Sequence, residues 1–195
     1  MLVVGLGNPT EEYVMTRHNA GRNAVMAFAQ SCDEAVSWKL DKKLRALRAT
    51  VSVGNTTVDC LLPETFMNNS GGSVKPLITS AKKAESLIVV YDDLDIPFGV
   101  VTIAFNKGAG GHNGLASIIK AVKTKEFIRV RVGVAPTTPS GKIKKPKGEE
   151  AVLKFILGEF SKKEKEVLPE VYKKIILALE TIVRDGKDKA MTALN

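Results

Sequence analysis

The sequence has few of the residues on which several classes of protein depend. Its two cysteines, Cys32 and Cys60, have no second Cys or His at the spacing of metal ligands, which excludes a zinc site and a disulfide framework. No apolar run approaches the roughly 18 residues that a membrane-spanning helix needs. The first residues, MLVVG, resemble a strand and not the charged start of a signal peptide. We therefore expect a soluble intracellular protein.

Common enzyme motifs are also missing. No G-x-S-x-G nucleophile elbow occurs, so no serine is marked as a covalent nucleophile. Gly5-Leu6-Gly7 imitates a dinucleotide-binding loop, but Thr10 stands at the position of the third glycine. The glycine-rich run 108–114 lacks the Gly-Lys-Ser/Thr ending of a phosphate-binding loop. These absences argue against a nucleotide cofactor.

Acidic residues are scarce beside basic ones, with 21 Asp+Glu against 29 Lys+Arg and a net charge of +8. The segment 120–147 accounts for this excess, because Glu126 is its only acidic residue. Its basic residues are Lys120, Lys123, Lys125, Arg129, Arg131, Lys142, Lys144, Lys145 and Lys147. Such a concentration favours a polyanionic partner, since cations that meet phosphates release condensed counterions. The alternative is a solvated basic loop without a partner.

Short apolar runs alternate with segments of helical spacing, which is the pattern of an α/β fold. Two β-rich runs joined by Gly54-Asn55 predict an antiparallel hairpin. The length of 195 residues suits one domain. We therefore predict a single domain over residues 1–195, with a twisted mixed β-sheet flanked by helices. Strands are expected at 2–6, 45–53, 56–62, 87–91, 100–105 and 127–134, and helices at 19–35, 74–83 and 115–122.

The C-terminal part of the chain begins with a segment that has no apolar periodicity. Residues at about 135–148 are rich in Pro, Thr, Gly and Lys and predict a mobile basic surface loop. A short helical segment is expected within 152–160. Ser161 and Glu164 form a capping-box pattern, which predicts a final helix over about 161–185 that Pro169 interrupts. Residues after Gly186 are expected to fray.

Polar side chains follow the predicted strands, where open α/β sheets present their ligand sites. They are Asn8, His18, Asn68, Asp92, Asp93, His112 and Asn113. His18 is the stronger of two candidates for a general base, because Asp92 can orient its imidazole. His112 is also explained as a residue that only packs the loop. A His–Asp pair without a nucleophile elbow favours activation of water, and therefore direct hydrolysis.

Two other interpretations stay open on this reasoning alone. Asp92, Asp93 and Asp95 suit a metal site, as in a metal-dependent hydrolase of phosphorylated small molecules, which chelators would inactivate. The basic segment suits a non-catalytic RNA-binding protein. Replacing His18 in such a protein would lower its affinity for RNA, and there would be no turnover to lose.

Five motifs follow one another along the chain: VGLGNP at 4–9, TRHNAG at 16–21, FMNNSG at 66–71, DDLDIP at 92–97 and GGHNGL at 110–115. In this order they resemble the signature segments of the bacterial-type peptidyl-tRNA hydrolases, over almost the full chain. The resemblance implies hydrolysis of the ester between a peptide and the tRNA 3′ ribose, which recycles tRNA from aborted translation, without metal or organic cofactor. It also implies one α/β domain, in agreement with the fold predicted above.

The same resemblance implies roles for individual residues. His18 would be the base and Asp92 its orienting partner, while Asn8 would help to distinguish blocked from free aminoacyl groups. The positions that contact the end of peptidyl-tRNA are matched by Tyr13, Phe66, Asn68 and Asn113. Arg131 matches one member of a basic pair that clamps the 5′ phosphate, and Lys107 is the nearest substitute for the other, since Ala104 stands at its position. The implied partner is the acceptor end of peptidyl-tRNA, with its 3′ CCA and 5′ phosphate, bound by a monomer.

Besides Ala104, the chain departs from the family pattern in three places. Thr10 and Ala135 stand where glycine is usual, so we expect both neighbouring turns to differ in shape. The Lys142–Lys147 insertion resembles eukaryotic members. The expected location is the cytoplasm. For a eukaryotic source, the mitochondrial matrix is the alternative.

Overall fold

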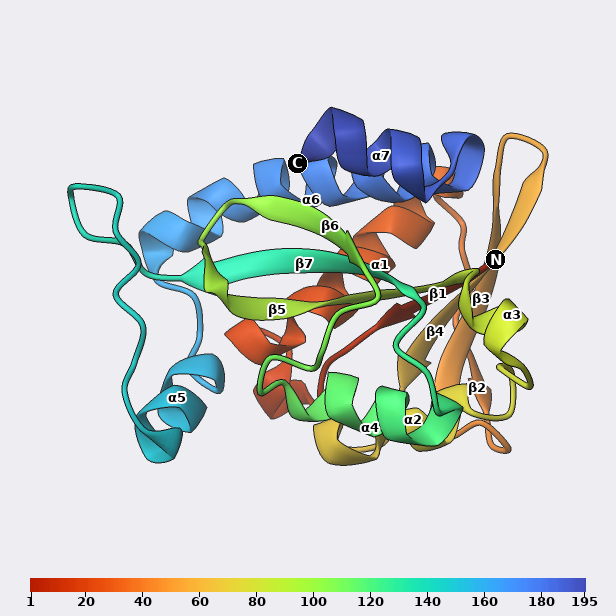
Figure 1. Cartoon of the computed structure of the whole chain (residues 1–195), viewed down its shortest axis with the longest axis horizontal. Helices are drawn as coiled ribbons and strands as arrows, with labels where there is room; N and C mark the ends of the chain where they lie inside the picture. Colours follow the sequence, from red (N-terminus) through yellow and green to blue (C-terminus); the bar gives the residue numbers. More distant parts are fainter.

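The structure, a computed structural model that describes residues 1–195, is built on one mixed sheet of seven strands (Figure 1). The strands are β1 (Leu2–Gly5), β2 (Lys39–Asp41), β3 (Ala46–Val53), β4 (Thr56–Pro63), β5 (Leu87–Pro97), β6 (Val101–Phe105) and β7 (Ile128–Ala135). Their order across the sheet is β2-β3-β4-β1-β5-β7-β6. The predicted α/β fold with a mixed sheet is confirmed.

The centre of the sheet is parallel and its margins are antiparallel. Strands β4, β1, β5 and β7 run in one direction, while β2, β3 and β6 pair antiparallel with their neighbours. The hairpin predicted at Gly54-Asn55 joins β3 and β4, and Gly54 has a φ of 58°, which glycine adopts at little cost. The carboxyl ends of the parallel strands meet at one edge, which is where ligand sites of such sheets lie.

Helices cover both faces of this sheet. They are α1 (Ala20–Cys32), α2 (Ser70–Val74), α3 (Ala81–Ala84), α4 (Asn113–Val122), α5 (Glu149–Ile156), α6 (Lys162–Asp185) and α7 (Lys187–Leu194), with 3₁₀ turns η1 (Glu11–Tyr13), η2 (Arg17–Asn19) and η3 (Met67–Asn69). Helices α1 and α6 pack on one face, and α2 and α4 on the other (Figure 1). None of the helices has the length and apolar character needed to cross a membrane.

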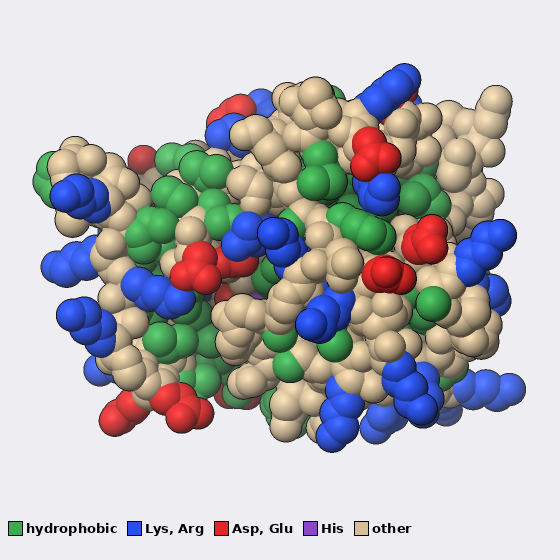
Figure 2. Space-filling model, viewed as in Figure 1, with side chains coloured by type: hydrophobic (Ala, Val, Ile, Leu, Met, Phe, Trp, Pro, Cys, Tyr) green, Lys and Arg blue, Asp and Glu red, His purple; other side chains and the backbone are tan.

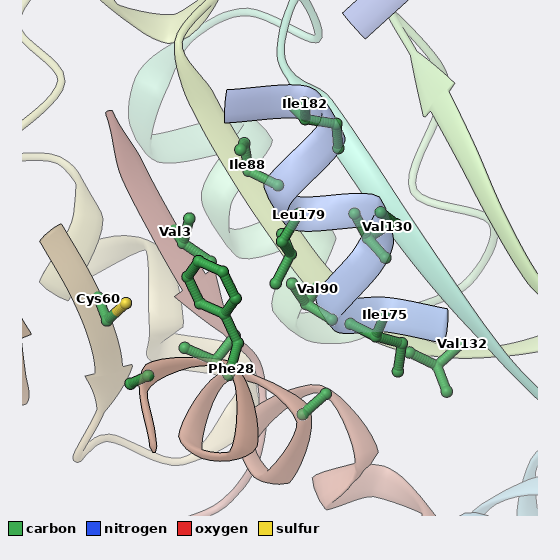
Figure 3. Close-up of a cluster of buried hydrophobic side chains, with 14 of the residues drawn as sticks. Val3, Phe28, Cys60, Ile88, Val90, Val130, Val132, Ile175, Leu179 and Ile182 are labelled. Carbon is green, nitrogen blue, oxygen red and sulfur yellow. The ribbon is translucent and has the colours of Figure 1, made fainter. Parts of the chain in front are cut away.

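The central strands supply apolar side chains to both layers. Val3, Ile88 and Val90 lie in one cluster with Phe28 of α1 and Leu179 of α6 (Figure 3). Their sequence neighbours lie in the second cluster, beneath α2 and α4: Leu2, Val4, Leu87 and Val89. Because both faces are covered, these strands appear in the sequence as continuous apolar runs.

Gly21, in the first turn of α1, allows the helix to approach β5 closely. A Cβ atom at this position would collide with the carbonyl oxygen of Val90 and the Cα of Tyr91. The close approach brings η2, the turn just before α1, against the part of β5 that follows Tyr91. The glycine of the TRHNAG motif therefore positions His18 beside Asp92.

Three elements before residue 100 differ from the prediction. The helix expected at 74–83 is wrong: α2 ends at Val74 and α3 begins at Ala81, because Pro76 has no N–H to continue a helix. Strand β5 runs on to Pro97, with an irregularity between Asp93 and Pro97, so the two aspartates expected after the strand lie within it. The short strand β2 was not predicted, since three residues carry almost no periodic signal.

Helix α6 begins as predicted but is not interrupted. Ser161 Oγ accepts from the N–H of Glu164 at 3.3 Å, and Glu164 Oε2 accepts from the N–H of Ser161 at 2.7 Å, which is a complete capping box. Pro169 lies inside the helix. Its side chain is exposed, so the carbonyl group that loses its N–H partner can be hydrated.

The end of the chain is helical, and the expectation of fraying was wrong. Helix α7 buries Ala190 against the first core cluster. Beyond it, Asn195 Oδ1 accepts from the N–H of Ile103 at 2.7 Å, and Asn195 Nδ2 donates to the carbonyl of Ile103 at 2.9 Å. Ile103 lies in the edge strand β6, so this amide satisfies backbone groups that an edge strand otherwise leaves unpaired.

Candidate active site

His18 and Asp92 meet at the carboxyl edge of the sheet. His18 lies in η2, and its Nδ1 is 3.0 Å from each carboxylate oxygen of Asp92 in β5. Both side chains are buried. Because a carboxylate only accepts, Nδ1 carries the proton, and the Nε2 of His18, which has no hydrogen-bond partner in the chain, keeps its lone pair. The arrangement is that of an oriented general base.

His112 forms the second contact of the Asp92 carboxylate. Its Nε2 lies 3.0 Å from Asp92 Oδ1, and its Nδ1 accepts from the N–H of Leu115 at 3.2 Å as the N-cap of α4. The bond from Leu115 fixes the tautomer, so Nε2 is the atom that donates to Asp92. Asp92 therefore lies between two imidazoles, and His112 does more than pack the loop.

The charges of this trio are mutually supporting. Burial alone would raise the pKa of Asp92, but His18 and His112 outweigh it and hold the pKa well below its usual range. Burial alone would lower the pKa of His18, but the charge and hydrogen bond of Asp92 raise it above its ordinary value. Asp92 is thus a carboxylate at every pH near neutrality, and it makes His18 a stronger base.

Asn8, directly after β1, is buried and held by hydrogen bonds to Met67 and Asn19. Its Oδ1 accepts from the N–H of Met67 at 2.9 Å. Its backbone N–H donates to Asn19 Oδ1 at 2.8 Å, and its carbonyl accepts from Asn19 Nδ2 at 3.0 Å. The Nδ2 of Asn8 makes no hydrogen bond within the chain and is free to donate to a ligand. Sequence reasoning missed Asn19, although a polar residue beside His18 in the TRHNAG motif was a usable signal.

The turn after Asn8 keeps a shape that usually requires glycine. Thr10 has a φ of 80°, a conformation that costs a β-branched residue energy. The backbone at Thr10 thus has a conformation that glycine adopts readily, in spite of the side chain. Ala135 ends β7 opposite Pro97 in ordinary extended backbone.

A cavity of about 470 Å³ opens beside the trio. His18, Asp92, His112 and Asn113 line one part of it. The other part is largely apolar and comes from β5, the glycine-rich loop and α5: Leu94, Ala109, Val152, Leu153 and Ile156. Figure 2 looks into this hollow, with histidine atoms on its floor, hydrophobic side chains on its left wall, and Lys or Arg side chains at its left rim.

The remaining predicted contact residues lie outside this cavity. Phe66 is 56% exposed, and Asn68 is exposed in η3. Tyr13 is half-buried in η1. All three follow the carboxyl ends of β1 or β4, on the same edge of the sheet as Asn8, so they border the site without lining its cavity.

The basic side chains of β7 differ in burial. Arg131 Nε donates to Asp93 Oδ2 at 2.9 Å, and its guanidinium also lies beside the Tyr91 hydroxyl. Arg129 is fully buried, donates to the backbone oxygens of Lys107, Lys125 and Phe127, and stacks on the Phe127 ring. The prediction that Arg129 belongs to the basic surface was wrong. Strand β7 is covered on both faces, so the alternation of Arg with apolar residues along it does not identify a face exposed to solvent.

Lys107 has an exposed side chain whose ammonium has no partner in the chain. The register pairs Arg131 with Thr102, and Lys107 lies beyond the end of β6 at Phe105. The two residues proposed for a clamp are therefore not adjacent in the sheet.

The three aspartates of the DDLDIP motif do not converge on one metal site. Asp92 is bonded to the histidines, Asp93 to Arg131, and Asp95 to Lys145 at 2.6 Å. The one cluster whose ligand-type atoms converge is His18, Asp92 and His112, all within 4.8 Å. A metal there would have to replace the hydrogen bonds that hold the trio.

Comparisons with protein families, with curated proteins and with solved structures all match this chain to the same family. The family model described as peptidyl-tRNA hydrolase matches residues 2–195. The peptidyl-tRNA hydrolase of Syntrophotalea carbinolica is 38% identical and that of Herpetosiphon aurantiacus 39% identical, over 100% of this chain and 96% and 89% of the relatives. The crystal structure of peptidyl-tRNA hydrolase from Acinetobacter baumannii is 31% identical, with a TM-score of 0.86 over 100% of this chain and 93% of that one.

Proposed function

The chain belongs to the peptidyl-tRNA hydrolase family and hydrolyses the ester between a peptide and the tRNA 3′ ribose, and we propose that His18 activates the attacking water. The observation that carries this proposal is the bond from His18 Nδ1 to Asp92, which leaves Nε2 as a base beside the cavity. A neutral imidazole with a free nitrogen is the group that can remove a proton from water near neutral pH.

In the proposed reaction, His18 Nε2 takes a proton from water as its oxygen attacks the ester carbonyl carbon. The imidazolium that forms is stabilised by Asp92. It then returns the proton to the ribose 3′-oxygen as the carbon–oxygen bond of the ester breaks, which releases the peptide acid and tRNA. The exposed amides of Asn68 and Asn113 are donors suited to the substrate carbonyl, on which negative charge develops.

Asn8 supplies a basis for selecting blocked aminoacyl groups. Because Met67 fixes its oxygen, the free Nδ2 presents only donors. A peptide or N-acyl carbonyl accepts from these donors, whereas a free α-ammonium has no lone pair to offer. We propose that this mismatch protects free aminoacyl-tRNA. Since one chain supplies every group named so far, we also propose that the enzyme acts as a monomer.

The test is release of labelled peptide from purified N-acetyl-aminoacyl-tRNA, compared with free aminoacyl-tRNA, with and without a chelator. We expect release from the blocked substrate only, and equal rates in both conditions because the trio acts by proton transfer. Loss of activity on chelation that a divalent ion restores would contradict the water-activation proposal.

Recognition of the tRNA 5′ phosphate is assigned to Arg131. Asp93 binds its Nε, and the side chain is 30% exposed, so a phosphate can reach the guanidinium from solvent. We expect Arg131→Ala to raise the KM for intact peptidyl-tRNA at least about tenfold, since charge-assisted contacts contribute roughly 1.5–3 kcal/mol. KM for a peptidyl-adenosine ester, which lacks that phosphate, should hardly change.

The control for this prediction is Lys107→Ala. If Lys107 completes the clamp, its removal should raise the same KM, and an unchanged value would limit the clamp to Arg131. Equal losses on both substrates for Arg131→Ala would instead place this side chain in folding or in the catalytic centre. Neutralising the four lysines of the 142–147 insertion should flatten the salt dependence of tRNA association if they supply long-range attraction.

A further inference from the structure

Arg17, the neighbour of His18 in η2, joins segments that are far apart in the sequence. Its Nη1 donates to the carbonyls of Phe155, Gly158 and Glu159 at 3.5, 3.3 and 2.7 Å, and its Nη2 donates to Glu164 Oε2 at 2.8 Å. The guanidinium also lies over the Phe155 ring, 4.3 Å from its centroid. The side chain is 10% exposed and does not line the cavity. It therefore binds protein and not substrate.

These contacts fall at the junction between α5 and α6. Phe155 lies in the last turn of α5, and Gly158 and Glu159 lie just after this helix, where a helix C-terminus favours a cation. Glu164 is the capping-box residue of α6, so a single carboxylate oxygen accepts from both Ser161 and Arg17. One planar guanidinium thus fixes the end of one helix to the beginning of the next, which a lysine ammonium cannot reproduce.

Beside the Arg17 side chain, helix α5 is held through the segment that follows it, where the N–H of Arg17 donates to the carbonyl of Gly158 at 3.1 Å. None of its residues is buried, and η2 is the element that it contacts most. Figure 1 shows α5 set apart from the helices that cover the sheet, at the end of the long segment that follows β7. Yet Val152, Leu153 and Ile156 of this helix form the apolar wall of the active-site cavity.

We infer that Arg17 is a positioning residue that holds α5 against the cavity and so sets the affinity for the peptide part of the substrate. The inference rests on the function proposed above and adds that α5 is the surface met by residues upstream of the ester. Apolar peptide side chains gain from contact with the wall only while the wall stands at a fixed distance from His18. Arg17 fixes that distance because it is covalently next to His18 and bonded to the end of α5.

The experiment compares two substrates with the same reacting residue, N-acetyl-glycyl-tRNA and the same tRNA carrying N-acetyl-Leu-Leu-Gly. The wild type should show a lower KM for the longer substrate. In Arg17→Gln, KM for the longer substrate should rise about fivefold, which is the usual scale of one coupled contact, while KM for the short one changes less than about twofold. In Arg17→Lys, KM for the longer substrate should lie between the values of the wild type and of Arg17→Gln. In both variants kcat should stay within about twofold of the wild-type value for both substrates.

Arg22→Gln is the matched control. Arg22 pairs with Glu64, and its side chain is 12% exposed, but its contacts lie at the end of β4 and not at α5. Arg22→Gln should lose about as much thermal stability as Arg17→Gln, but the ratio of the KM values for the two substrates should stay as in the wild type. Glu164→Gln, which keeps the capping oxygen and removes the charge, should shift the ratio in the same direction as Arg17→Gln even if the latter fails to fold.

Three results would overturn the inference. Equal KM changes for both substrates, or no advantage of the longer substrate in the wild type, would mean that α5 does not receive the peptide. A fall in kcat alone would place Arg17 in the orientation of His18. Failure of the wild type to release either peptide would contradict the proposed function itself, which separates the two claims.

Discussion

Replacing His18 by alanine is expected to slow ester cleavage at least about a hundredfold, because a positioned general base contributes typically 10²–10⁴ in rate. His112, the other imidazole in the cavity, cannot take its place. His112 uses Nε2 toward Asp92 and Nδ1 toward Leu115, so neither nitrogen is free to accept a proton from water. The loss should appear in kcat under saturating substrate.

Binding of tRNA should be nearly intact in the same variant. His18 contacts Asp92, not the exposed cations, and Asp92 keeps the bond from His112, so its charge is not left without a partner. The measurements are single-turnover release of labelled peptide, tRNA affinity, and a thermal unfolding curve. A folded His18→Ala protein with near-normal turnover would remove His18 from the mechanism.

The parts of the fold that were predicted correctly are those with a local signal. The continuous apolar runs of β1 and β5 identify strands covered on both faces. Gly54-Asn55 determines a hairpin, and Ser161 with Glu164 marks the start of α6. The structure brings His18 and Asp92 together as expected, because the apolar run 87–91 ends at the carboxyl edge of the sheet and the helix that follows His18 packs on the same strand.

The parts that were missed depend on partners distant in sequence. Arg129 alternates with apolar residues as a solvent-facing side chain would, and only the covering of β7 reveals that it is buried. Asn195 bonds to a strand 92 residues earlier, and Arg17 reaches residues 138 to 147 positions later, so no local pattern could show either contact. The role of His112 depends on the N–H of Leu115 at the start of α4. A sequence pattern gives the residue types but not these pairings.

Asp92→Asn should reduce the rate by a different route, and its pH dependence identifies that route. The amide keeps the shape of the carboxylate, but its NH₂ group can donate to His18 Nδ1 and so favour the tautomer that carries its proton on Nε2. An imidazole in that form has no lone pair directed at water. Loss of the correct tautomer costs up to about 10⁴ in the serine-protease example, and we expect a loss of at least about tenfold here.

The direction of the pH shift follows from the charge. His18 acts as a base only when neutral, so kcat/KM rises with pH through the pKa of His18 in the free enzyme. Asp92 raises that pKa by its charge and hydrogen bond. Replacing it with a neutral amide removes this stabilisation of the imidazolium, so the pKa falls and the acidic limb of the profile moves to lower pH.

His112→Asn is the control that separates this effect from general disturbance of the trio. It removes one contact of Asp92 but leaves the carboxylate charge facing His18. With one donor fewer, the carboxylate of Asp92 interacts at least as strongly with His18, so the pKa of His18 should be unchanged or higher. The acidic limb should therefore stay in place or move to higher pH, the opposite of the shift expected for Asp92→Asn. A downward shift in both variants would show that the limb reports the integrity of the site. An upward shift in Asp92→Asn would contradict the pairing, because loss of a negative neighbour cannot make an imidazole more basic.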